Sequence, residues 1–467
     1  MKWNPLIFRE YDIRGVVGSD IDEDFAYALG RAFGTYVRRR MRHVLAVGRD
    51  CRHSSEPLFR ALARGLMDSG CDVVDVGVVP TPLLYFSLFV LPVQGGVQIT
   101  ASHNPPEFNG FKLCVGKDTL YGPQIQEVRQ LMESGDFIAD GPGSLRTEPD
   151  IIGQYVQHVL DNLNVGPRRV RVVVDAGNGT AGPVAPVLYE RMGAEVTCLY
   201  CEMDGSFPNH HPDPVVPENI RDLRARVLEV GADLGIGFDG DADRIGVVDE
   251  RGEIIWGDQL LIIFARDLLS IQRDVPIIFE VKCTLLLEWE IERLRGIPVM
   301  WKAGHSLIKA KMRELAAPLA GEMSGHMFFG DRYFGYDDAI YAGARLIEIL
   351  SHSQQPLSAF LADLPKTYAT PEIRVYCPDE VKFRVVERVT DHFRRLGRPL
   401  VDVDGVRVKY DDGWGLVRAS NTQPALVLRF EALSEEALRR IQDEIYGVVY
   451  ATLRAFGVPT TGSPMGH

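Results

Sequence analysis

The sequence predicts an α/β protein in which three similar domains precede a smaller α+β domain. Three observations support this fold class. The chain has 467 residues, a length that favours about three domains of ordinary size. One strand–loop–helix–strand pattern recurs three times before residue 302. The C-terminal part instead contains strands joined by turns and a long final helix.

The first copy of the recurring pattern is the clearest. The apolar run 44–47 predicts a buried strand, the polar segment 48–55 a loop, residues 56–69 a helix and residues 73–76 a second strand. Because both strands are apolar without alternation, we expect them inside a largely parallel sheet that helices cover on both faces.

Two further copies of the pattern follow at residues 170–199 and 275–301, with predicted helices that end at Arg191 and Leu294. Each copy is a βαβ-like unit, with apolar strands suited to burial on both faces. Three such units predict three related α/β domains, each a mixed sheet flanked by helices.

The C-terminal part has a different pattern. The run 401–410, the Asp-Asp-Gly turn at 411–413 and the strands 415–419 and 425–430 predict an antiparallel sheet, and a helix is expected over 434–454. The linker-like segments between the domains are rich in glycine, proline or polar residues. We therefore expect four domains with the bounds 1–148, 149–251, 252–366 and 367–467.

The composition limits the partners of the chain. It has 51 Lys and Arg against 64 Asp and Glu, and this net charge of -13 disfavours non-specific binding to nucleic acid or an anionic membrane. The longest apolar run, 83–91, is too short to span a bilayer. The seven cysteines are scattered, and no signal-peptide region precedes Arg9, so we expect a cytoplasmic protein with a small-molecule partner.

The strongest local signal is Asp-Gly-Asp-Ala-Asp-Arg at residues 239–244. The carboxylates of Asp239, Asp241 and Asp243 offer hard oxygen ligands for Mg²⁺ or Ca²⁺, and like charges this close favour a cation among them. A calcium EF-hand is disfavoured because Arg244 stands where that loop needs glycine. A haloacid-dehalogenase-type phosphotransferase is disfavoured because its Asp-x-Asp motif normally opens the chain.

Ser102 lies in the sequence Thr-Ala-Ser-His-Asn-Pro, directly after the apolar strand 96–99. Catalytic groups are commonly presented at the end of a strand. His103 is suited to donate to a phosphate, and Lys112 to neutralise one or to transfer a proton. Taken alone the motif also describes an ordinary turn. No Gly-x-Ser-x-Gly elbow surrounds the serine, which disfavours an esterase.

Two later segments carry groups suited to a phosphorylated sugar. The segment 418–422 is a compact set of donors for a phosphate dianion, and Arg429 on the next strand is placed to reinforce it. The segment 321–326, Gly-Glu-Met-Ser-Gly-His, offers a carboxylate, a hydroxyl and an imidazole to sugar hydroxyls. Each segment alone also fits a polar loop.

One motif favours a different enzyme class. Gly-Asn-Gly-Thr-Ala-Gly at residues 177–182 follows a strand, and Glu202 lies about twenty residues further on, as in a dinucleotide-binding unit. A nicotinamide-dependent sugar dehydrogenase is therefore an alternative. The other two copies of the repeat lack these glycines, which disfavours it.

Taken in order, these motifs resemble those of the α-D-phosphohexomutases. The resemblance extends from Arg-Glu-Tyr-Asp-Ile-Arg-Gly at residues 9–15 to the loop of Arg418, and four motifs occur in the family order. It implies four domains around a central cleft, the first three alike, in agreement with the three repeats. It also implies that Ser102 carries a phosphoryl group that completes the Mg²⁺ site of Asp239, Asp241 and Asp243.

The motifs and the resemblance together give a set of candidate residues. The candidate catalytic residues are Ser102, His103, Lys112, Arg14 and His326. The candidate substrate-binding residues are Tyr11, Arg244, Lys282, His305, Glu322, Ser324, Arg418, Ser420, Asn421, Thr422 and Arg429.

The activity that the resemblance implies is an intramolecular phosphotransfer. A phosphohexomutase interconverts the 1-phosphate and 6-phosphate of mannose or glucose through a phosphoserine and a hexose 1,6-bisphosphate, which also activates it. Met323 resembles the mannose and glucose branch, and a phosphoglucosamine mutase remains the alternative. A phosphosugar-binding protein without activity is an alternative of another class. The sequence leaves open whether the chain is a monomer or a dimer.

Overall fold

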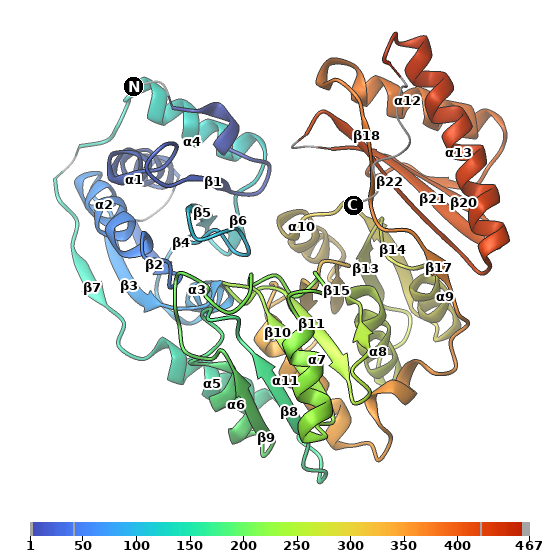
Figure 1. The fold of residues 1–467 in the computed structure, drawn as a ribbon. Helices are drawn as coiled ribbons and strands as arrows, with labels where there is room; N and C mark the ends of the chain where they lie inside the picture. Colours follow the sequence, from blue (N-terminus) through green and yellow to red (C-terminus); the bar gives the residue numbers. More distant parts are fainter. Residues whose placement is uncertain (1–2, 41–42, 140, 421–422, 460–467) are drawn as a thin grey trace. The chain divides into compact units, whose positions relative to one another are not determined.

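The computed structural model describes residues 3–40, 43–139, 141–420 and 423–459. The chain divides into two compact units (Figure 1). Unit 1 comprises Met1–Asp267 and Gly304–Phe360, and unit 2 comprises Leu268–Ala303 and Leu361–His467. In the described part of the chain, none of the helices combines the length and the apolar character needed to cross a membrane.

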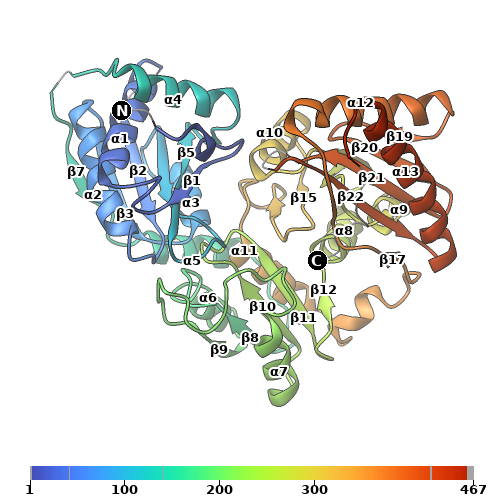
Figure 2. The same cartoon turned by 45° about the horizontal axis from the view of Figure 1, so that its top comes forward.

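The first sheet of unit 1 has seven strands, in the order β1-β5-β4-β2-β3-β7 with β6 on β5. Its central strands β4, β2 and β3 are parallel and buried, as the apolar runs predict. Helix α2 connects β2 to β3, and α3 connects β3 back across β2 to β4, so the two connections run in opposite directions along the sheet. Right-handed crossovers therefore place α2 and α3 on opposite faces (Figure 2). The strands are β1 Ile13–Val16, β2 Val44–Arg49, β3 Asp72–Val78, β4 Gly95–Ile99, β5 Phe108–Val115, β6 Asp118–Thr119 and β7 Leu145–Thr147. The helices are α1 Glu23–Arg38, α2 Ser55–Asp68, α3 Thr81–Val90 and α4 Pro123–Ser134, after the short 3-10 helix η1 Pro5–Ile7.

The second sheet of unit 1 repeats this pattern with five strands, in the order β12-β11-β10-β8-β9. Strand β8 pairs in parallel with β9 and β10, and β10 then pairs antiparallel with β11. The strands are β8 Arg171–Asp175, β9 Glu195–Leu199, β10 Leu234–Phe238, β11 Ile245–Asp249 and β12 Ile254–Ile255. The helices are α5 Ile151–Asn162, α6 Ala185–Arg191 and α7 Arg221–Val230.

The third copy of the pattern is divided between the units. Unit 2 contains the parallel pair β13 Pro276–Glu280 and β14 Ile297–Trp301, with α9 Leu285–Arg293 between them. Unit 1 contains the antiparallel pair β15 Leu319–Gly321 and β16 Met327–Phe329. The other elements of this region are α8 Gly257–Ile271, α10 His305–Leu315, α11 Ala339–Ser351 and the 3-10 helix η2 Leu357–Leu361.

The C-terminal part of unit 2 is an antiparallel sheet of six strands, in the order β17-β22-β21-β20-β19 with β18 on β22, which confirms the predicted α+β fold. Helices α12 and α13 cover the face of the sheet that carries Val406, Val408, Val417 and Leu428. The strands are β17 Tyr368–Ala369, β18 Ile373–Tyr376, β19 Leu400–Val401, β20 Val406–Tyr410, β21 Gly413–Ala419 and β22 Ala425–Ala432. The helices are α12 Asp379–Arg395 and α13 Glu435–Ala455.

The glycine-rich turn after β8 has a packing role. A Cβ on Gly182 would lie 1.9 Å from the carbonyl oxygen of Cys201, and a Cβ on Gly179 would lie 2.7 Å from that of Gly240. Helix α6 begins only at Ala185, so the glycines do not open it. Close backbone contact therefore accounts for these glycines without a bound dinucleotide.

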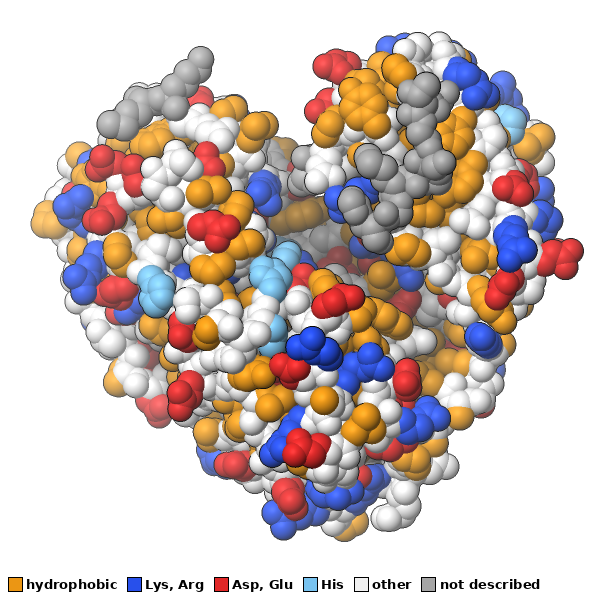
Figure 3. Space-filling model, viewed as in Figure 1, with side chains coloured by type: hydrophobic (Ala, Val, Ile, Leu, Met, Phe, Trp, Pro, Cys, Tyr) orange, Lys and Arg blue, Asp and Glu red, His pale blue; other side chains and the backbone are white. Residues whose placement is uncertain are grey.

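The surface of unit 1 over α7 mixes both signs of charge, as Figure 3 shows. Arg226 pairs with Glu229 and Arg221 with Asp222 along this helix, at exposed positions. Opposite charges on this helix thus lie in pairs.

Candidate active site

Three of the predicted motifs occupy the same place in the repeated unit. Each is the loop that connects the third strand of a repeat to the antiparallel strand that follows it. The loops are residues 100–107 between β4 and β5, 239–244 between β10 and β11, and 322–326 between β15 and β16. All three belong to unit 1. The repeat therefore brings the serine, metal and sugar motifs to equivalent strand ends.

Ser102 is buried at the tip of the first loop, with its backbone in the left-handed region at φ 52°. Its N–H donates to the side-chain oxygen of Thr100 at 2.9 Å, which stabilises this unusual turn. Its hydroxyl donates to Oδ2 of Asp239 at 2.6 Å and lies 3.1 Å from Nδ1 of His103. The first two loops thus meet at the Ser102 hydroxyl.

Arg52 fixes the backbone of the Ser102 loop. The side chain is 2% exposed, and it donates to the carbonyl oxygens of Ser102 and Asn104 at 3.0 and 2.6 Å. It also donates to the carbonyl oxygens of Pro105 and Phe108. In the sequence this arginine is only one of several basic residues at loop edges that are available to a phosphate. Its role in the serine loop was missed, because its carbonyl partners are about fifty residues away and carry no sequence signal.

Replacing Arg52 with methionine is expected to lower the free energy of unfolding by about 3–5 kcal/mol, measured by urea denaturation. The change leaves the carboxylate of Asp50, which lies 3.1 Å from Nε of Arg52, buried without its cation. Arg60→Met on α2 is the matched control, because that side chain is 76% exposed and its pair with Glu56 contributes about 0.5 kcal/mol or less. Equal losses in the two variants would contradict the clamping role.

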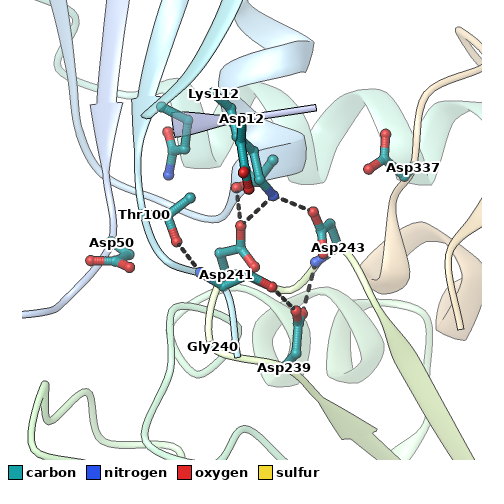
Figure 4. A network of polar contacts seen from close by, with 12 residues as sticks. Asp12, Asp50, Thr100, Lys112, Asp239, Gly240, Asp241, Asp243 and Asp337 are labelled. Carbon is teal, nitrogen blue, oxygen red and sulfur yellow. Dashed lines mark hydrogen bonds and ion pairs between the residues drawn. The ribbon is translucent and has the colours of Figure 1, made fainter. Parts of the chain in front are cut away.

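The three aspartates of the second loop form a candidate metal centre (Figure 4). Asp239, Asp241 and Asp243 are at most 1% exposed, and one ligand oxygen of each lies within 4.8 Å of the others. Oδ1 of Asp241 accepts no hydrogen bond from any described residue, and Oδ1 of Asp243 has only the distant Nε2 of His326, at 3.4 Å. Buried carboxylate oxygens without donors fit a hard divalent cation.

Gly240 and Ala242 allow the metal loop to approach the serine loop. A Cβ on Gly240 would lie 2.5 Å from the carbonyl oxygen of Ser102, so only glycine fits there. Ala242 adopts a left-handed conformation, with φ 58°. The backbone N–H groups of Asp243 and Arg244 both donate to Oδ1 of Asp239 at 3.1 Å, which closes the turn.

Lys112 is the cation nearest to these carboxylates. Its Nζ contacts the carboxylate of Asp243 and lies 2.7 Å from Oδ2 of Asp241, with the side chain 3% exposed (Figure 4). Burial alone would lower the pKa of Lys112, but the coulombic effect of Asp241 and Asp243 outweighs it and raises the pKa. Burial, Asp243 and Asp241 raise the pKa of Asp239 well above its ordinary value. The lysine is thus held as a buried ammonium at the metal loop.

The third loop reaches the metal loop through His326. Its Nε2 lies 3.4 Å from Oδ1 of Asp243, and its Nδ1 lies 3.1 Å from Oε2 of Glu322 and 3.0 Å from the Ser324 hydroxyl. Burial opposes the charge on His326, but Asp243 and Glu322 outweigh it and raise its pKa to about 9. Arg244 is next to this ring, with Nε 3.4 Å from Nε2 of His326.

The remaining unit 1 candidates lie around this centre. His305 stacks on His326 with ring centroids 5.7 Å apart, and Tyr11 lies 6.0 Å from the His305 ring. Burial, Lys309 and Lys112 hold the pKa of His305 well below its ordinary value. Arg14 donates to Oδ1 of Asn104 at 2.6 Å, in the serine loop. Burial, Arg244 and Arg14 likewise hold the pKa of His103 well below its ordinary value.

Four further candidates belong to unit 2. Nζ of Lys282 lies 3.1 Å from Oε1 of Glu372, and Arg418 pairs with Asp404 at 3.0 Å. Arg429 on β22 pairs directly with Leu416 on the neighbouring strand β21. Leu416 and Arg418 are two residues apart on β21, so Arg418 and Arg429 lie on the same face of the sheet. Ser420 follows β21 directly. Asn421 and Thr422 lie outside the described residues.

Comparison with known protein families gives four successive matches. Residues 5–139, 153–252 and 256–368 match alpha/beta/alpha domains I, II and III of phosphoglucomutase/phosphomannomutase. Residues 372–448 match the C-terminal domain of the same enzymes. Together the four models cover most of the chain in their expected order.

Individual relatives agree with these matches. The chain is 49% identical to a phosphomannomutase/phosphoglucomutase of Pseudomonas aeruginosa over 97% of each sequence. It is 46% identical to a phosphoglucomutase of Neisseria gonorrhoeae, over 95% of this chain and 96% of that one. A solved structure of a phosphoglucomutase/phosphomannomutase family protein from Burkholderia thailandensis has a TM-score of 0.93 and 43% identity, and covers 99% of this chain and 100% of that chain.

Proposed function

Because the chain belongs to the phosphoglucomutase/phosphomannomutase family, we propose that Ser102 is the group that gives and recovers the transferred phosphoryl. The protein is a hexose phosphate mutase, an intramolecular phosphotransferase. One observation carries the assignment: the Ser102 hydroxyl lies 2.6 Å from Oδ2 of Asp239, inside the buried cluster of metal-loop carboxylates. A phosphoryl group on this oxygen would lie beside a cation held by these carboxylates, and such a cation would offset the negative charge of the transferring group.

The proposed reaction uses phosphorylated Ser102 as the starting state. The free hydroxyl oxygen of a hexose 1- or 6-phosphate bonds to phosphorus, the bond from phosphorus to Oγ of Ser102 breaks, and the hydroxyl proton passes to a base. Hexose 1,6-bisphosphate is formed. After the sugar turns over, the other phosphoryl returns to Ser102, so the number of phosphoryl groups on enzyme and sugar is conserved.

The proposed metal is Mg²⁺, held by Asp239, Asp241 and Asp243 with a phosphate oxygen on Ser102. The family is metal-dependent, and the donor set of carboxylates without nitrogen or sulfur suits Mg²⁺. When bound, the ion would offset negative charge on the transferring group. The protein's part is to hold the Ser102 oxygen against these carboxylates in a site that excludes water.

Replacing Asp241 with asparagine is expected to weaken Mg²⁺ binding about tenfold to a hundredfold, as measured by calorimetric titration of the protein with the ion alone. The change removes one carboxylate charge while it keeps the volume of the side chain. Asp249→Asn is the matched control, because Asp249 is equally buried but accepts from the backbone N–H groups of Arg251 and Glu253. Unchanged Mg²⁺ affinity in Asp241→Asn would contradict the proposed ligand set.

The substrate-binding roles follow the chemistry of each group. We assign Glu322 and Ser324 to the sugar hydroxyls and Arg244 to the reacting end of the substrate. Lys112 and His326 are the candidates for proton transfer, because both stand beside the metal loop. Arg14 and His103 remain catalytic candidates beside Ser102. The other assigned groups bind substrate or its non-reacting phosphate, and they are Tyr11, Lys282, His305, Arg418, Ser420, Asn421, Thr422 and Arg429.

The preferred sugar is proposed from Met323 and from the names of the relatives. Several relatives near half identity are named for mannose, glucose or both, whereas a probable phosphoglucosamine mutase of Methanopyrus kandleri is 36% identical. We expect higher initial rates with mannose 1-phosphate and glucose 1-phosphate than with glucosamine 1-phosphate, in a coupled assay with catalytic hexose 1,6-bisphosphate. A faster rate on glucosamine 1-phosphate would instead support the alternative activity.

Location and domain bounds complete the proposal. Seven free cysteines support a cytoplasmic protein, in agreement with the expectation from the sequence. The four family matches support domains bounded near residues 148, 251 and 366.

A further inference from the structure

One face of the C-terminal sheet in unit 2 carries the buried side chains of Arg407, Trp414 and Glu431. Arg407 on β20 pairs across the strands with Leu416 on β21, which pairs with Arg429 on β22, so the three share a face. Trp414 and Glu431 are cross-strand partners on the same face. This face is opposite the one that packs on α12 and α13, and α9 lies beside it (Figure 2).

Arg407 is anchored to the segment that carries Lys282. Its guanidinium is 1% exposed, and one nitrogen, Nη1, donates to the carbonyl oxygens of Val281 and Cys283 at 2.8 and 2.6 Å. The plane of the guanidinium lies over the Trp414 ring, with its carbon 3.8 Å from the centroid. Burial lowers the pKa of Arg407 to about 10, and Glu431 opposes this effect. The residues on both sides of Lys282 in the chain are therefore bound through their carbonyl oxygens to the guanidinium of Arg407.

Glu431 anchors the next two residues of the same segment. Its Oε1 accepts from the Thr284 hydroxyl at 2.7 Å, and its Oε2 accepts from the backbone N–H of Leu285 at 2.8 Å. Nε1 of Trp414 also donates to Oε2, at 2.7 Å. Glu431 is 3% exposed, so these hydrogen bonds are made without competition from water. Segment 281–285 is thus fixed at four of its five residues, Lys282 being the exception, by a network of three side chains.

The side chain of Lys282 leaves this fixed segment toward two carboxylates. Its Nζ lies 3.6 Å from Oε1 of Glu280 and 3.1 Å from Oε1 of Glu372. Burial opposes the charge, but Glu280 and Glu372 outweigh it and raise the pKa of Lys282. Glu280 and Glu372 thus fix the Lys282 ammonium, whereas the position of the Lys282 backbone depends on the contacts that Arg407 and Glu431 make with segment 281–285.

We propose that Arg407, Trp414 and Glu431 are positioning residues that hold segment 281–285 so that Lys282 meets the substrate at a fixed place. The proposal rests on the role of Lys282 in the proposed function. The three residues act through the backbone around Lys282 and contact no substrate themselves. The same network joins that segment to strand β21, which carries Arg418, so two proposed substrate-binding cations share one support in unit 2.

Arginine is required at position 407 for a geometric reason. One planar guanidinium meets two carbonyl oxygens and also stacks on an indole ring, which a lysine ammonium cannot do. Arg407→Lys keeps the charge but loses the stacking and one or both carbonyl bonds. It is therefore expected to raise the KM for hexose 1-phosphate about tenfold while kcat changes much less.

A double-mutant cycle tests whether Arg407 acts through Lys282. Lys282→Ala alone is expected to lower kcat/KM, and adding Arg407→Lys to it should cause little further loss. Losses that multiply in the double variant, or an unchanged KM in Arg407→Lys, would overturn the inference. If Lys282→Ala itself leaves kcat/KM unchanged, the role of Lys282 in the proposed function is wrong, and the positioning role is wrong with it.

Two additional variants separate positioning from general destabilisation. Glu431→Gln keeps the shape of the side chain and is expected to raise KM in the same direction, so the test remains available if Arg407→Lys does not fold. Arg345→Lys is the matched control in unit 1, because Arg345 is also buried and pairs with Asp331 at 2.9 Å. It is expected to lower the melting temperature without a change in KM. A KM that rises equally in Arg345→Lys would show that the effect is only structural.

Discussion

Ser102→Ala is expected to lower kcat by about a thousandfold or more, because it removes the oxygen that gives and recovers the phosphoryl group. Binding of the hexose phosphate should change little, since the sugar and phosphate loops are untouched. The loop is expected to keep its conformation in Ser102→Ala. The Ser102 hydroxyl contacts Asp239 and His103, whereas the loop itself is held by Thr100 and Arg52.

The matched control for this variant is Ser87→Ala. Ser87 is also buried, but its hydroxyl donates to the carbonyl oxygen of Leu84 within α3. It is expected to retain wild-type rates in the coupled mutase assay. Substantial turnover by Ser102→Ala with catalytic hexose 1,6-bisphosphate would exclude the covalent role of this serine.

Lys112→Met is expected to have the second largest effect, a loss of about 10²–10⁴-fold in kcat if the lysine transfers a proton. The variant should also make the protein's stability depend more on Mg²⁺. Without the ammonium, the buried carboxylates of Asp241 and Asp243 lose their nearest cation, and breaking such a pair costs about 3–5 kcal/mol. Added Mg²⁺ would restore part of that loss.

The check is a melting curve of each protein with and without Mg²⁺, recorded beside the mutase rate. The rise in melting temperature on adding Mg²⁺ should be larger in Lys112→Met than in the wild type. Lys309→Met is the matched control, because Lys309 is a buried lysine that pairs with Asp337 at 2.8 Å and is not a proposed proton donor. Wild-type kcat in Lys112→Met would exclude proton transfer by this residue.

The sequence predicted the repeated units and the C-terminal α+β domain because their signals are local. Apolar runs without alternation gave the buried strands β2, β8 and β13, and the Asp-Asp-Gly turn preceded the paired strands of the C-terminal sheet. The metal loop was also predictable, since its three carboxylates lie within five residues. These features are fixed by residues close together in the chain.

The supporting residues could not be predicted in the same way. Arg52 binds carbonyl oxygens of residues 102–108, and Arg407 binds those of Val281 and Cys283. A backbone carbonyl has the same chemistry at every position, so no side chain marks the partner. Gly240 likewise reads as a small spacer, and only the approach of the Ser102 carbonyl explains it. Contacts distant in sequence therefore required the structure.

The most direct test of the covalent role of Ser102 is the transfer of labelled phosphoryl from hexose 1,6-bisphosphate to the protein. Label is expected to appear on the peptide that contains Ser102 and to leave again on addition of hexose 1-phosphate, and Ser102→Ala is expected to acquire none. Label on a different residue, or full turnover while the Ser102 peptide never becomes phosphorylated, would contradict that role.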